Sequence, residues 1–113
     1  MIKKLCMFTV VFCMTFILTS ISYSQDICRS VGIIAEKIMI ERQNDTDISI
    51  MMDYANSFQI WELNKEKNDI LKNIFRNIII DAYSRPFYNS DMFKKDAVRN
   101  FKNIIMVECY KTL

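Results

Sequence analysis

The chain of 113 residues contains a single glycine, Gly32, and a single proline, Pro86. Glycine and proline build most tight turns, and a fold of short strands needs several of them. Beyond the first 24 positions, apolar residues recur every three or four positions rather than in alternation, which is the spacing of amphipathic helices. We therefore predict an all-α fold, a small antiparallel bundle of about four helices.

Four stretches carry this helical spacing, over about residues 27–42, 48–55, 65–84 and 91–109. Thr46 or Asp47 can cap the second helix through its side-chain oxygen. Pro86 ends the third helix, because the residue before a proline is pushed out of helical geometry. Asn89 or Ser90 can cap the fourth.

The side chains expected to face the core share the helical spacing within each stretch. They are Ile27, Cys28, Val31, Ile34, Ala35, Ile38 and Met39; Ile48, Met51, Met52 and Ala55; Leu71, Ile74, Phe75, Ile78, Ile79 and Ala82; and Phe93, Ala97, Val98, Phe101, Ile104, Ile105 and Cys109. We expect these side chains to form the core of one compact domain.

The first 24 residues have the composition of a secretory signal peptide. Residues 1–4 are basic, residues 5–21 are almost uncharged and apolar, and Ser22 and Ser24 supply the small residues of a cleavage site. We place the cut after Ser24, which leaves residues 25–113 as a single helical domain in the periplasm or outside the cell. An uncleaved membrane anchor is the alternative, because the apolar run approaches the roughly 17–25 residues that span a bilayer.

Cleavage would leave two of the four cysteines, Cys28 and Cys109. In an oxidising compartment these two can pair in only one way, and we predict a disulfide between them. An even number of antiparallel helices places the start of the first and the end of the last at the same end of the bundle, so the bond needs no distortion. Two free buried thiols are the alternative.

Charge argues against nucleic acid and against a membrane surface as partners. Lys3 and Lys4 carry the whole formal net charge of +2, so residues 25–113 are neutral. A neutral chain has no basic excess to neutralise phosphate. We therefore expect no nucleic-acid partner and no stable membrane association after cleavage.

The chain contains no histidine, which removes the commonest general base and metal ligand. Residues 45–47 resemble the start of a calcium loop, but Ile50 and Asn56 stand where the loop needs a glycine and a bidentate glutamate. We interpret residues 45–47 as a capping turn, and we predict no metal and no cofactor.

Carboxylates are the remaining catalytic option. Glu36 with Glu41, or Asp81 with an acid of the fourth helix, would act as general acid and base, as in a small glycan hydrolase. Such a pair needs a cleft and one raised pKa, whereas most helix-face carboxylates are simply solvated. We expect that the protein is not an enzyme.

Methionine and aromatic side chains are common at adaptable binding surfaces. Two segments rich in them are candidate partner-binding residues: Met51, Met52, Tyr54, Phe58 and Trp61 first, and Arg85, Phe87 and Tyr88 second. The alternative is that these side chains complete a small core. We expect a protein partner, in the manner of an immunity protein or an enzyme inhibitor, with a holdase-like envelope-stress role as the alternative.

One resemblance supports export. The residues that carry it are Cys28, residues 35–39, Arg42, Gln43, residues 81–90, Phe101, Cys109 and Tyr110. They resemble the pattern of small exported helical proteins of Gram-negative bacteria and their phages, a terminal cysteine pair with an Ala-Tyr-x-x-Pro turn. The resemblance implies a periplasmic or secreted location and assigns no catalytic residue.

Overall fold

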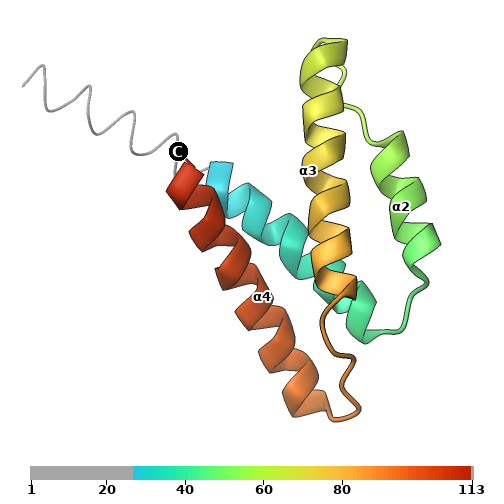
Figure 1. Ribbon diagram of the computed structural model, residues 1–113, viewed down its shortest axis with the longest axis vertical. Coiled ribbons are helices and arrows are strands. Elements are labelled where there is room, and N and C mark those ends of the chain that lie inside the picture. Colours follow the sequence, from blue (N-terminus) through green and yellow to red (C-terminus); the bar gives the residue numbers. More distant parts are fainter. Residues whose placement is uncertain (1–26, 113) are drawn as a thin grey trace, which may run out of the picture.

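The computed structural model describes residues 27–112, which form four helices and no strand (Figure 1). The N-terminal helix covers residues 27–43 and is followed by α2 (Ile48–Ser57), α3 (Lys65–Tyr83) and α4 (Asp91–Thr112). The predicted all-α fold of four helices is confirmed. The predicted leader, residues 1–24, lies outside the described residues.

The helices associate in two pairs. The N-terminal helix packs most extensively on α4, and α2 packs on α3 (Figure 1). The N-terminal helix also passes the lower end of α3, where the two pairs meet. Away from this junction, the first half of the N-terminal helix and the upper half of α3 point in different directions (Figure 1). The two helix pairs therefore share a core only near the junction.

Cys28 and Cys109 form the predicted disulfide, with their Cα atoms 5.5 Å apart. The bond joins the beginning of the N-terminal helix to the last turns of α4. Because both cysteines lie at the same end of this helix pair, the even-helix topology inferred from the sequence is confirmed as well.

Gly32 lies between these two helices next to the disulfide. A Cβ atom at this position would stand 2.6 Å from Cγ of Met106 and 2.7 Å from its sulfur. The missing side chain therefore allows the N-terminal helix and α4 to approach closely.

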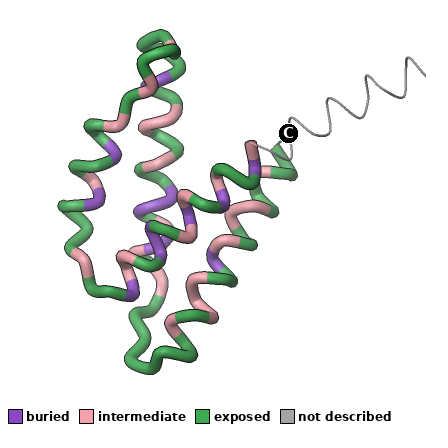
Figure 2. The backbone as a smooth tube through the Cα atoms, turned by 180° about the vertical axis from the view of Figure 1, so that it is seen from behind, coloured by how far each residue is buried: buried purple, intermediate pink, exposed green. Residues whose placement is uncertain are grey.

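The core lies where the N-terminal helix crosses its neighbours, and the buried positions gather there (Figure 2). All four helices contribute to it: Ala35, Ile38 and Met39; Met51 and Ala55; Ile78, Ile79 and Ala82; and Phe101. Phe101 is the largest of the fully buried side chains. The sequence spacing predicted every member of this cluster.

Polar side chains set the helix boundaries. Asp47 is the N-cap of α2 and accepts from Ser49, which confirms the capping turn. Asn64 caps α3, and the Ser90 hydroxyl accepts from the backbone of Phe93 at the start of α4. Each cap satisfies an N–H group that the first helical turn leaves without a partner.

The link between α2 and α3 is organised by Asn68, which is only 5% exposed. Its carboxamide accepts from the backbone N–H of Ile60 and donates to the carbonyls of Ile60 and Leu63, at 2.9–3.2 Å. One buried side chain thereby satisfies three backbone groups of residues 58–64. This role of Asn68 was not predicted from the sequence.

Four side chains predicted to face the core are exposed instead. Ile48, the first residue of α2, is 40% exposed. Ile74 is 43% exposed because the upper half of α3 extends beyond the helix crossing. Phe93 is 57% exposed in the first turn of α4, where its ring lies 5.9 Å from that of Tyr88. Ile104, 39% exposed, lies at the margin of the core beside Phe101.

Candidate functional site

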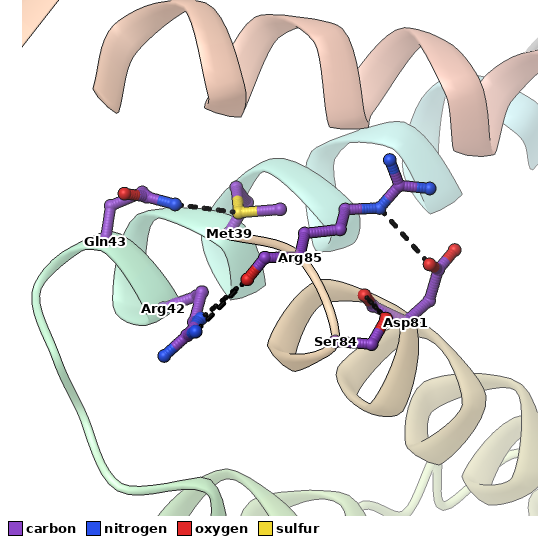
Figure 3. Close-up of polar contacts among 6 residues, drawn as sticks. All are labelled: Met39, Arg42, Gln43, Asp81, Ser84 and Arg85. Carbon is purple, nitrogen blue, oxygen red and sulfur yellow. Dashed lines mark hydrogen bonds and ion pairs between the residues drawn. The ribbon is translucent and has the colours of Figure 1, made fainter. Parts of the chain in front are cut away.

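The end of the N-terminal helix is joined to the turn between α3 and α4 by a polar latch, residues 42, 43 and 85–88 (Figure 3). Arg42 donates twice to the backbone carbonyl of Arg85, at 3.1 and 3.3 Å. Gln43, 3% exposed, donates to the carbonyl of Pro86 and accepts from the N–H of Tyr88, both at 3.0 Å. Two side chains therefore fix the backbone of a segment more than forty residues away.

Neighbouring groups strengthen this latch. The Arg85 side chain forms an ion pair with Asp81 at 3.2 Å (Figure 3) and lies over the Phe101 ring. Lys94 donates to the backbone carbonyl of Gln43 and lies 4.0 Å from the centre of the Phe87 ring. The second candidate segment, Arg85, Phe87 and Tyr88, thus has an evident structural role.

Tyr83 makes another hydrogen bond from a side chain to the backbone of a distant segment: its hydroxyl donates to the carbonyl of Thr46 at 2.6 Å. Burial raises the pKa of Tyr83, and the negative charge of Glu41 raises it further. The hydroxyl therefore stays protonated and able to donate at neutral pH.

A groove runs between the N-terminal helix and α2. Its lining residues come from the N-terminal helix, α2, the link and α3: Ile34, Lys37, Ile38, Ile40, Glu41, Thr46, Ile50, Met51, Tyr54, Phe58 and Phe75. The volume is about 650 Å³. The Phe58 and Phe75 rings, 5.4 Å apart, close it towards α3.

A second cavity of about 490 Å³ continues the first along the N-terminal helix. It is lined by Ile27, Ser30, Val31, Ile34, Phe58, Ile60, Leu71, Ile74, Phe75 and Ile78. Ile34, Phe58 and Phe75 line both cavities, so the two cavities adjoin, and we call them together the apolar groove. Ile74 is exposed because its side chain lines this groove.

The structure divides the first candidate segment. Tyr54 and Phe58 line the apolar groove, and Tyr54 is 67% exposed. Met51 also lines the apolar groove, but it is only 8% exposed and belongs to the core cluster, so most of its surface is already covered within the protein. Met52 packs against the core, and Trp61, 84% exposed, lies outside the groove.

Several other residues that line this groove were not predicted as part of a binding surface. Ile34 and Phe75 were assigned to the core and are only partly buried there, while Ile50 is 50% exposed. Lys37 was not singled out at all. The apolar spacing places a side chain on a helix face, but only the angle between packed helices decides whether that face is covered.

The three carboxylates considered for catalysis each interact with a basic side chain or a hydroxyl group. Glu36 pairs with Lys102 at 3.2 Å, Glu41 accepts from the Thr46 hydroxyl at 2.6 Å, and Asp81 pairs with Arg85. Among residues 27–112 no cluster of acidic or cysteine side chains could hold a metal ion. Within the same range no helix is long and apolar enough to cross a membrane.

Comparisons of the chain with protein-family models, with curated proteins and with solved structures found no match. The apolar groove and the latch therefore have to be interpreted from their own geometry.

Proposed function

We propose that this protein is an exported helical module that binds another protein through the apolar groove. The observation that carries the proposal is the groove itself, two adjoining cavities that are lined by residues of three helices and whose lining is largely apolar. Leaving such a surface in water costs roughly 25 cal/mol for each Å². Contiguous apolar patches on the surface of a protein often have a function.

The disulfide and the leader composition support a compartment outside the cytoplasm, the periplasm or the extracellular space. The ordinary pairing of Glu36, Glu41 and Asp81 supports a binding role over catalysis. A protein of this kind would act by occupying a surface of its partner, as inhibitors and immunity proteins do.

The test is purification of the tagged protein from periplasmic extract under non-reducing conditions. We expect one partner in stoichiometric amount. Ile50→Glu should abolish its recovery, because the substitution places a carboxylate inside the groove. Ile33→Glu is the matched control: Ile33 is 48% exposed on the N-terminal helix and lies outside the groove.

Two results would contradict the proposal. Recovery of many unrelated polypeptides in small amounts would indicate a holdase. Recovery of the same partner by the Ile50→Glu variant would place the binding surface elsewhere.

A further inference from the structure

We infer that the occupant of the apolar groove is an amphipathic α-helix of the partner, with an acidic residue at the margin that faces Lys37. This inference rests on the proposed function and specifies the chemistry of the partner. It follows from the backbone of the groove, from its dimensions and from its charges.

The backbone of the groove walls offers little to an extended peptide. Most of the lining belongs to the N-terminal helix, α2 and α3, whose backbone N–H and C=O groups bond within each helix. Three lining residues lie outside the helices, and the backbone groups of Thr46 and Ile60 and the N–H of Phe58 already have partners within the protein. A strand lying there would leave its own polar backbone without partners on the groove side. A helix satisfies its backbone internally and presents only side chains, so the groove selects a helix.

The dimensions suit about four helical turns. The lining of the two cavities extends along the N-terminal helix from Ile27 to Glu41. At a rise of 1.5 Å per residue this distance is about 21 Å, the length of about 14 residues of a docked helix. The three residues that line both cavities, Ile34, Phe58 and Phe75, are all apolar, so the middle of the groove requires an apolar stripe.

The charged residues of the groove indicate which kind of residue the docked helix carries along one edge. Within the described part of the chain, Lys37 and Glu41 are the only charged residues that line the groove, and they stand one turn apart. The Glu41 carboxylate already accepts the Thr46 hydroxyl. Lys37 takes part in no hydrogen bond or ion pair among residues 27–112. A carboxylate of the partner is the group that complements this ammonium.

The test uses a phage-displayed library of random helical peptides of about 18 residues, long enough to hold a helix. The library is selected on the purified, unreduced protein. We expect enriched sequences to repeat apolar residues at every third or fourth position and to carry Asp or Glu along one margin. Selection on a Lys37→Glu variant should enrich Lys or Arg at that margin instead.

Binding of an enriched peptide is then measured by fluorescence anisotropy. We expect Lys37→Glu to weaken it about two- to tenfold, as suits one exposed ion pair replaced by a repulsion. Ile50→Glu should weaken it at least about 30-fold because a carboxylate enters an apolar contact. Ile33→Glu, the control outside the groove, should bind as the parent protein does.

Enriched peptides without an apolar stripe, or with equal affinity for the Ile50→Glu variant, would overturn the inference. So would unchanged margin residues in the Lys37→Glu selection. Concentration-dependent self-association abolished by Ile50→Glu would assign the groove to a second copy and overturn it too. The proposed function fails separately, when no groove-dependent protein partner is recovered from periplasm.

Discussion

Replacement of Gln43 tests whether the polar latch holds the two halves of the chain together. The Gln43 side chain is buried and bonds the carbonyl of Pro86 and the N–H of Tyr88, both at 3.0 Å. Gln43→Met keeps the length of the side chain and removes both bonds. Either substitution also removes the weaker hydrogen bond from Gln43 Nε2 to the Met39 sulfur at 3.5 Å, and Gln43→Ala removes most of the side chain as well.

The magnitude follows from the two bonds. A typical hydrogen bond contributes about 0.5–1.5 kcal/mol, and a buried partner left unsatisfied costs about 1–3 kcal/mol. Water can reach part of the turn, because Tyr88 is 36% exposed. We therefore expect Gln43→Met to lower the free energy of unfolding by about 2 kcal/mol, and Gln43→Ala by as much or more.

The assay is thermal unfolding followed by circular dichroism, with the disulfide intact. A loss of about 2 kcal/mol should lower Tm by roughly 8–16 °C in a domain of this size. The control is Asn44→Ala, which changes the next residue, whose side chain is exposed and should cost less than about 0.5 kcal/mol. Parental stability of Gln43→Met would refute the reasoning, because the bonds would then contribute nothing.

Three further predictions concern stability. Replacement of both Cys28 and Cys109 by serine should cost about 4–5 kcal/mol in urea unfolding, since the disulfide closes a long loop with a sequence separation of 81; an unchanged urea midpoint would contradict this. Tyr83→Phe should cost about 1 kcal/mol at neutral pH through the lost bond to Thr46. Because burial raises the pKa of Tyr83 above 10.0, its contribution is complete below that pH and declines as the pH rises through the folded pKa, so the variant should lose less stability in alkali. The Ser49 hydroxyl and N–H lower the pKa of Asp47 from 3.8, so the difference in Tm between the parent and Asp47→Ala should be present above that pH and vanish as the pH falls through the folded pKa.

The helices and their caps could be predicted because they depend on the local spacing of residues. The disulfide could be predicted because two cysteines can pair in only one way. Asp47 and Ser90 act at the predicted caps, and Cys28 pairs with Cys109 as expected. The tertiary hydrogen bonds could not be predicted in this way. Gln43 and Asn68 look like ordinary surface residues in the sequence, and only the fold brings them to the backbone groups that they satisfy.

The candidate site was predicted in part. Tyr54 and Phe58 were selected for their chemistry, and both line the apolar groove. Met51 has the same chemistry and also lines the groove, yet it is only 8% exposed because it belongs to the core cluster. Ile74 shows the converse, since an apolar residue in a core-facing stripe remains exposed where no helix crosses it. Composition cannot separate these cases.

Site-specific photocrosslinking in living cells tests the account most directly. A benzophenone side chain in place of Tyr54 lies in the groove, whereas the same group in place of Tyr110, 43% exposed on α4, lies outside it. The account predicts that position 54 crosslinks to one protein partner in the periplasm, at a helical segment, and that position 110 does not. Equal crosslinking at both positions, or at position 110 alone, would contradict it.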